Sequence, residues 1–170
     1  NNKKYNEKNA SIIYSSPMRR CKDTVGQLWR KANFIVDNNL TEIDYGFAEG
    51  ISYKELELKY PDITQSWKLG KDPNFPNGES TKDVLSRLNQ FLNNIKNEID
   101  NKNLKSICVV SHNVFLRTLI GSGYNLPQKK WYRLNIPHGV ALEFLYWNNN
   151  FSPNISRKDL SNIFADLSML

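Results

Sequence analysis

Short apolar runs bounded by polar or turn-forming residues predict the strands of this chain. Each run is too short for a helix and is rich in β-branched or aromatic residues, which favours a buried strand. The runs are ASIIYS at 10–15, NFIV at 33–36, SICVV at 106–110 and PHGVALEFLYW at 137–147. These four segments are the predicted strands.

Apolar residues at three- and four-residue spacing predict the helices between these strands. The first helical stripe comprises Met18, Cys21, Val25, Leu28, Trp29 and Ala32. The clearest stripe comprises Val84, Leu85, Leu88, Phe91, Leu92, Ile95 and Ile99, and Ser80 with Asp83 resembles a capping pair before it. Two short helical patterns meet at Pro61 between residues 53 and 69, and VFLRTLIG at 114–121 begins a further helix.

The last predicted helix lies in SRKDLSNIFADL at 156–167. Leu160, Ile163, Phe164 and Leu167 fall on its inward face. We treat residues 151–170 as a C-terminal helical tail of a single domain that covers residues 1–170, because this length is typical of one domain.

Strands and helices alternate along the chain, which predicts an α/β fold with a mostly parallel sheet covered by helices on both faces. Such sheets bind ligands outside the carboxyl ends of their strands. SSPMRR and SHN each follow a predicted strand. We therefore expect Arg19 or Arg20 to share one rim of the sheet with His112.

Composition narrows the class of protein. The net charge is +6, but the 23 Lys and Arg residues are scattered among 17 acids without a basic stripe, so nucleic-acid binding is not expected. No apolar run is long enough for a membrane span. Cys21 and Cys108 do not form a disulfide framework, which favours a reducing, cytoplasmic location. No Cys and His cluster has metal-ligand spacing, and no cofactor motif occurs.

His112 and Arg20 are the first candidates for chemistry. A histidine at the end of a strand is often only a hydrogen-bonded structural residue, but here it precedes a helix whose free N–H groups favour anions. The guanidinium of Arg20 suits bidentate phosphate contact. Arg19 points roughly 100° away from Arg20 on a helix, so only one of the two can face the site fully.

Glu42, Asp44 and Glu49 lie close together in one segment that also contains two glycines. This segment is either a solvated acidic loop or the source of a proton donor for a leaving alkoxide. Glu79 and Ser80, in FPNGES, are interpreted as a turn and helix cap.

The chain resembles the histidine phosphatase superfamily, whose fold is phosphoglycerate mutase-like. YSSPMRRCKDT is similar to the family's strand-end motif, with its phosphate-binding arginine at Arg20. LTEIDYGFAEG resembles the loop with the family's acid, at Glu42. VVSHNVFLR resembles the segment of the second catalytic histidine, at His112, although Asn113 stands where the family usually has Gly. FPNGES and LNIPHGVALEF match later segments, and together these motifs span about residues 10 to 147.

The resemblance implies a metal-independent phosphohistidine mechanism without a cofactor. Glu42 and His112 would be catalytic, and Arg20, His112, Ser16 and Asn113 would bind phosphate. The family's first strand ends in Arg-His-Gly, whose histidine is phosphorylated, and this triplet does not occur in the 170 residues. His138-Gly139 belongs to the last-strand motif. We expect either an upstream segment of about 30 residues, the size of a βα unit, or a truncated, inactive paralogue.

The resemblance also implies a small phosphorylated metabolite as substrate. Mutases of the family grip a substrate carboxylate with a pair of arginines, whereas this chain has Lys68 and Leu69 in that region, which favours water as the phosphoryl acceptor. We therefore predict a phosphomonoester hydrolase that acts on alpha-ribazole phosphate or a sugar phosphate. The alternatives are a phosphoglycerate mutase-type phosphotransferase and an inactive phosphate-binding paralogue.

Overall fold

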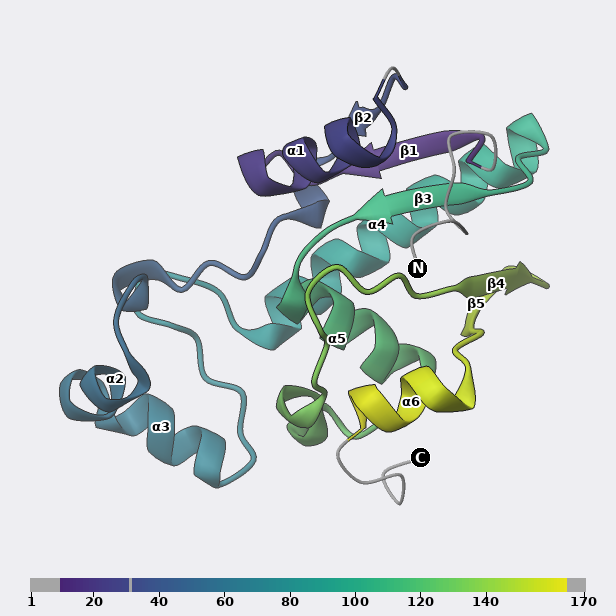
Figure 1. Cartoon of the computed structure of the whole chain (residues 1–170). Coiled ribbons are helices and arrows are strands. Elements are labelled where there is room, and N and C mark those ends of the chain that lie inside the picture. Colours follow the sequence, from purple (N-terminus) through teal and green to yellow (C-terminus); the bar gives the residue numbers. More distant parts are fainter. Residues whose placement is uncertain (1–9, 31, 165–170) are drawn as a thin grey trace. The chain divides into compact units, whose positions relative to one another are not determined.

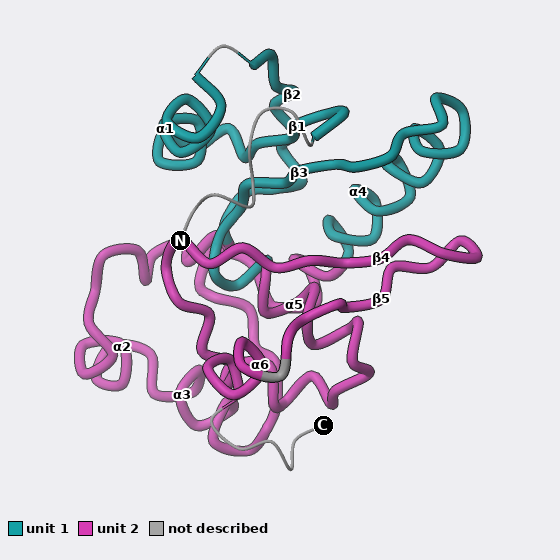
Figure 2. The backbone as a smooth tube through the Cα atoms, turned by 45° about the vertical axis from the view of Figure 1, so that its right-hand side comes forward, with its two compact units in different colours: residues 1–42, 86–115 teal, residues 43–85, 116–170 magenta. Residues whose placement is uncertain are grey.

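The computed structural model describes residues 10–30 and 32–164. The chain divides into two compact units, each built from two segments of the sequence (Figure 2). Unit 1 comprises residues 1–42 and 86–115, and unit 2 comprises residues 43–85 and 116–170.

A parallel three-stranded sheet forms the centre of unit 1 (Figure 1). Its strands are β1 (Ile12–Ser15), β2 (Ile35–Val36) and β3 (Ile107–Val110). The strand order is β2-β1-β3, with β1 parallel to both neighbours. Three of the four predicted strands are therefore confirmed, although β2 is shorter than the apolar run at 33–36.

Helices cover both faces of this sheet, as the alternation of elements predicts. Successive strand residues point to opposite faces of a sheet. The contacts of Ile13 and of Tyr14 therefore show which helix covers each face. Ile13 packs in a buried cluster with Val25 and Trp29, which belong to α1 (Arg19–Leu28) and the residue that follows it. Tyr14 contacts Phe91 of the helix α4 (Thr81–Lys102) edge-to-face, with ring centroids 5.4 Å apart.

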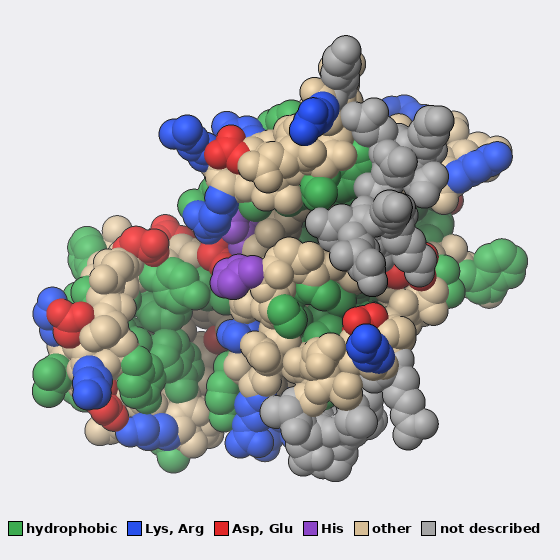
Figure 3. Space-filling model, viewed as in Figure 1, with side chains coloured by type: hydrophobic (Ala, Val, Ile, Leu, Met, Phe, Trp, Pro, Cys, Tyr) green, Lys and Arg blue, Asp and Glu red, His purple; other side chains and the backbone are tan. Residues whose placement is uncertain are grey.

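Two short helices occupy one part of unit 2. They are α2 (Tyr53–Lys59) and α3 (Pro61–Lys68), separated at Pro61 as predicted. Ser52 and Glu55 form a capping box that begins α2, and the proline stands in the first turn of α3, where no N–H is needed. Hydrophobic side chains are exposed over this segment (Figure 3); the exposed apolar residues here are Phe47, Tyr53, Leu58 and Leu69.

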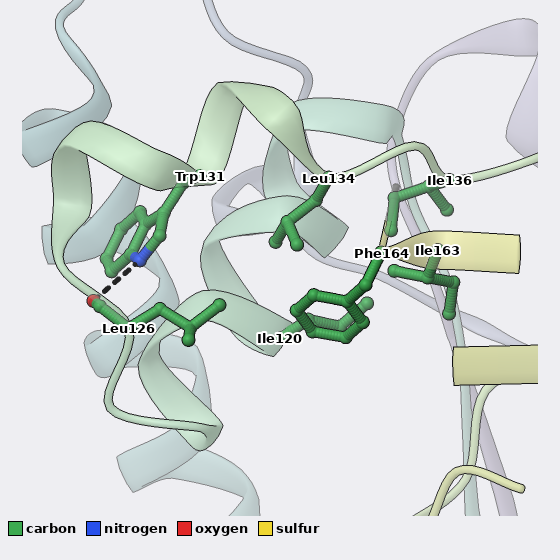
Figure 4. Packing of buried hydrophobic residues seen from close by; sticks show 7 residues of the cluster. All are labelled: Ile120, Leu126, Trp131, Leu134, Ile136, Ile163 and Phe164. Atoms are coloured by element: carbon green, nitrogen blue, oxygen red, sulfur yellow. Dashed lines mark hydrogen bonds between the residues drawn. The ribbon is translucent and has the colours of Figure 1, made fainter. Parts of the chain in front are cut away.

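The main core of unit 2 is a buried apolar cluster drawn in Figure 4. Its members are Ile120, Leu126, Trp131, Leu134, Ile136, Ile163 and Phe164. They come from α5 (Asn113–Gly123), the 3-10 helix η5 (Gln128–Arg133), α6 (Arg157–Ile163) and the segments beside them. The indole N–H of Trp131 donates to the carbonyl of Leu126 at 3.0 Å. A Cβ at Gly121 would lie 2.4 Å from the Trp131 ring, so glycine allows this close packing.

The end of the chain differs from the sequence-based prediction in two respects. The strand predicted for 137–147 is only β4 (Phe144–Trp147), because Pro137 and the positive φ of Gly139 interrupt extended pairing. β4 pairs antiparallel with β5 (Asn150–Pro153), which was not predicted. Two asparagines with positive φ, Asn148 and Asn149, form the tight turn between them.

The terminal helix is also shorter than predicted. α6 ends at Ile163, and Phe164 forms an isolated β-bridge with Leu134 instead of continuing the helix. Leu160, Ile163 and Phe164 do pack in the apolar cluster, as predicted. Leu167 lies outside the described residues.

Candidate active site

The candidate site lies entirely within unit 1, at the carboxyl ends of β1 and β3. The register places Ser15 opposite Val110, and the N–H of Ser16 donates to the Val110 carbonyl at 3.0 Å. The residues that follow the two strands, Ser16 and His112, therefore meet at the same edge. This agrees with the position of ligand sites in parallel sheets.

Two hydrogen bonds define the chemical state of His112. Arg20 Nε donates to Nδ1 at 3.1 Å, and the ring Nε2 lies 2.8 Å from the Ser16 hydroxyl. A guanidinium N–H can only donate, so Nδ1 must be unprotonated. The proton of the neutral ring is then on Nε2, and Nε2–H donates to Ser16 Oγ.

The surroundings of His112 oppose its protonation. The residue is only 6% exposed. Burial, followed by the charges of Arg20 and Arg87, lowers the pKa of His112 to about 4. The Cys21 thiol lies 3.4 Å from Nε2, and burial raises the pKa of that thiol, which keeps it neutral. Arg20 is therefore the charged member of this hydrogen-bonded pair, and His112 is the neutral one.

The titration of His112 predicts an acid-sensitive stability. Because the native pKa is about 4 and an unfolded histidine has a pKa of about 6.5, only the unfolded chain binds this proton between these values. Stability should therefore rise with pH across this window, and the His112 contribution, about 3 kcal/mol, should be lost as pH falls toward 4. Urea unfolding measured from pH 4 to 7 tests this, with His112→Gln as the comparison. Equal pH slopes for both proteins would contradict the assignment.

Glu42 is fixed by the start of α5. Its Oε1 accepts a hydrogen bond from the N–H of Val114 at 3.1 Å. The segment before Glu42 is fixed as well, because the Ser111 hydroxyl donates to the Leu40 carbonyl at 2.9 Å. Asp37 caps the 3-10 helix η3 (Asn38–Leu40) through the N–H of Asn39. The carboxylate thus belongs to the same unit as Arg20 and His112, at the end of the same sheet.

The side chain of Arg20, and not that of Arg19, points into the candidate site. The Arg19 side chain is 93% exposed and its Nε lies 3.5 Å from Asp23, one turn further along the same helix. Arg20 instead contacts a residue 92 positions away. Asn113, which was predicted to bind phosphate, is the first residue of α5 and is half-buried beside His112.

The turn and cap interpretation of FPNGES is confirmed. Both the hydroxyl and the N–H of Ser80 donate to Asp83, and Asp83 N–H donates back to Ser80. These bonds lower the pKa of Asp83. Glu79 accepts from the Asp44 N–H at 2.9 Å. These residues order a loop of unit 2.

Sequence reasoning missed one residue near the site. Arg87, half-buried on α4, donates to backbone carbonyls of the segment that contains Glu42. Arg87 is the only arginine in α4, whose other basic residues are lysines. This difference was the one sequence feature that could have drawn attention to it. That signal was hidden because Arg87 lies between Val84 and Leu88 of the apolar stripe.

Three further features bear on the kind of protein. Within residues 10–30 and 32–164, no group of three or more His, Cys, Asp or Glu side chains is arranged to bind a metal ion. No helix in the described part of the chain has the length and apolarity required to cross a bilayer. Both cysteines are free.

The fold and the site define an α/β protein with an arginine, a buried histidine and a carboxylate at the carboxyl edge of a parallel sheet. The chain belongs to the histidine phosphatase superfamily (branch 1), whose family model matches residues 2–154. The phosphoglycerate mutase-like assignment made from the motifs is therefore confirmed.

Curated relatives include phosphatases and longer proteins. The chain is 29% identical over 128 residues to the bifunctional protein Rv2228c of Mycobacterium tuberculosis, covering 74% of this chain and 34% of that protein. It is 24% identical over 127 residues to the fructose-2,6-bisphosphatase of Saccharomyces cerevisiae, covering 74% of this chain and 26% of that enzyme. The chain thus spans about a third or less of these two relatives.

Solved structures share the fold. The alpha-ribazole phosphatase of Shigella flexneri superposes with a TM-score of 0.72 at 16% identity, covering 88% of this chain and 76% of that one. A mutant phosphoserine phosphatase of Entamoeba histolytica, in complex with phosphoserine, gives a TM-score of 0.71 at 21% identity, covering 85% and 72%. Phosphatases of small phosphorylated metabolites are therefore among its neighbours.

Proposed function

We propose that this protein is a metal-independent phosphomonoester hydrolase that acts on a small phosphorylated metabolite through a phosphohistidine intermediate. The observation that best supports this is the Arg20–His112 pair at the end of the parallel sheet. It offers the Nη donors of the Arg20 guanidinium to the oxygens of a phosphoryl group, where charge spreads in the transition state, beside a neutral His112 whose Nε2–H donates to Ser16 Oγ. Ser16, which is fully buried, contributes by orienting His112.

The proposed nucleophile is a histidine outside these 170 residues. His112 and His138 are the two histidines of the chain, and neither stands in an Arg-His-Gly triplet. β3 supports this proposal: it lies at the edge of the described sheet, and its apolar residues Ile107 to Val110 are only half-buried. Parallel strands of this composition are normally paired on both edges and covered. A further strand beside β3 would bring its carboxyl end next to His112.

Glu42 would serve as acid and then as base. In the first step the nucleophilic histidine forms a P–N bond, the ester P–O bond breaks, and the Glu42 carboxyl gives its proton to the leaving oxygen. In the second step Glu42 takes a proton from water, the water oxygen bonds to phosphorus, and the P–N bond breaks. The products are an alcohol and inorganic phosphate.

Water is the proposed acceptor in preference to a second substrate. Lys68 and Leu69 occupy the region where a mutase would have an arginine pair, and Lys68 Nζ lies 2.7 Å from Glu57 Oε1. A sugar phosphate or alpha-ribazole phosphate fits this proposal. An inactive phosphate-binding paralogue is the alternative, favoured if no nucleophilic histidine exists.

Phosphoenzyme formation separates these functions. On incubation of the full-length protein with p-nitrophenyl phosphate, we expect an intact-mass increase of one phosphoryl group that is lost in acid but stable in alkali. Arg20→Met should reduce the rate of its formation by about 100-fold, because a charge stabiliser is removed. Arg19→Met is the matched control and should behave as wild type. Phosphate binding without a phosphoenzyme would support the inactive paralogue.

A further inference from the structure

We infer that Arg87 is a positioning residue for the Glu42 acid, a role that deepens the proposed hydrolase function and depends on it. Arg87 comes from α4, whereas Glu42 lies in the segment after β2. The two residues are 45 positions apart. They come into contact only when unit 1 is folded.

The guanidinium of Arg87 binds three backbone carbonyls. Nη1 donates to the Asn39 carbonyl at 2.8 Å and to the Thr41 carbonyl at 3.1 Å, and Nη2 lies 3.4 Å from the carbonyl of Glu42. A planar fork of N–H groups can reach several acceptors at once, which a lysine ammonium on a flexible stem does less well. The three carbonyls therefore converge on one rigid group.

Glu42 is consequently fixed at two points. Its main chain is bonded to Arg87 from α4, and its carboxylate accepts from Val114 N–H at the start of α5. A proton donor must lie within hydrogen-bond reach of the leaving oxygen, and a displacement of about 1 Å can cost about 100-fold in rate. Arg87 thus limits the positions that the acid can adopt.

Arg87 is not proposed to contact the phosphoryl group. The three hydrogen bonds that define its role end on backbone oxygens of residues 39–42. This role is therefore distinguishable from that of Arg20, which bonds to His112 directly. Loss of Arg87 should impair proton donation, whereas loss of Arg20 should impair every phosphoryl transfer.

The dependence on the leaving group tests this role. A nitrophenolate departs without a proton, but an alkoxide requires one. We therefore compare kcat/KM, which reports the phosphorylation step, for p-nitrophenyl phosphate and for an alkyl phosphate. In the full-length protein, Arg87→Met should lower kcat/KM for the alkyl ester by about 30-fold or more and for the nitrophenyl ester by less than about 3-fold. Arg87→Lys should give an intermediate loss with the same selectivity.

Arg19→Met is the control for removal of an arginine, and both of its kcat/KM values should match wild type, because that side chain is exposed. If circular dichroism shows that Arg87→Met does not fold, the ratio of the kcat/KM losses on the two esters in Arg87→Lys tests the positioning role instead. Equal losses on the two esters in a folded variant would overturn the positioning role, as would no loss on either. Absence of turnover by wild type would instead reject the proposed function, and this inference with it.

Discussion

Replacing Glu42 with glutamine is expected to lower turnover of an alkyl phosphomonoester by about 100-fold or more in the full-length protein, as for loss of a general acid. Glutamine has nearly the same shape, and its side-chain oxygen can still accept from the N–H of Val114, so the local structure should persist. The amide cannot donate a proton to an alkoxide or take one from water. Steady-state phosphate release measures the effect.

Glu49→Gln is the matched control for this substitution. Glu49 follows in the same stretch of sequence, but its side chain is exposed and it belongs to unit 2. Its turnover should remain within about two-fold of wild type, as is usual for surface substitutions. Unchanged turnover in Glu42→Gln would remove Glu42 from the catalytic residues and leave the acidic loop as a solvated one.

Replacing Phe91 with alanine is expected to lower the free energy of unfolding by about 3–5 kcal/mol, the range for large core aromatics. Phe91 is 2% exposed. Its ring meets Tyr14 of β1 at 5.4 Å and Phe115 of α5 at 6.4 Å, both edge-to-face. The truncation leaves a cavity between three elements of unit 1 and removes both aromatic contacts. Urea unfolding monitored by circular dichroism measures the change.

Phe47→Ala provides the control for loss of a phenylalanine. Phe47 is 68% exposed, so its truncation should change the unfolding free energy by no more than about 0.5 kcal/mol. A loss below about 1 kcal/mol in Phe91→Ala would show that the site collapses around the smaller residue. In that case Phe91 would not be the centre of the unit 1 core.

The elements with strong local patterns were predictable. β1 and β3 are short β-branched runs, and α4 keeps one apolar stripe over its length. The covering of the sheet on both faces followed from the alternation of these elements. β5 was missed because NFSP is only four residues long and contains Asn and Pro, which are uncommon in strands, and it is extended through its pairing with β4. The end of α6 was missed because the apolar spacing continues past Ile163, whereas the bridge of Phe164 to Leu134 overrides helical periodicity.

The residue types of the site were also predictable, but their geometry was not. The sequence placed Arg20 and His112 after strands; helical periodicity alone left open which of Arg19 and Arg20 faces the site, and the family resemblance pointed to Arg20. The contact of Arg20 with His112 spans 92 positions, and that of Glu42 with Val114 spans 72. No local pattern encodes such separations.

By itself, the sequence determined the α/β class and the family, and it predicted which residues would bind a phosphoryl group, because periodicity, strand-end position and side-chain chemistry are properties of neighbouring residues. Only the tertiary structure decided the neutral tautomer of His112 and the bonding of Arg87 to the Glu42 segment. Hydrogen bonds and burial depend on which distant groups the packed sheet and helices bring together, so these features exist only in the fold.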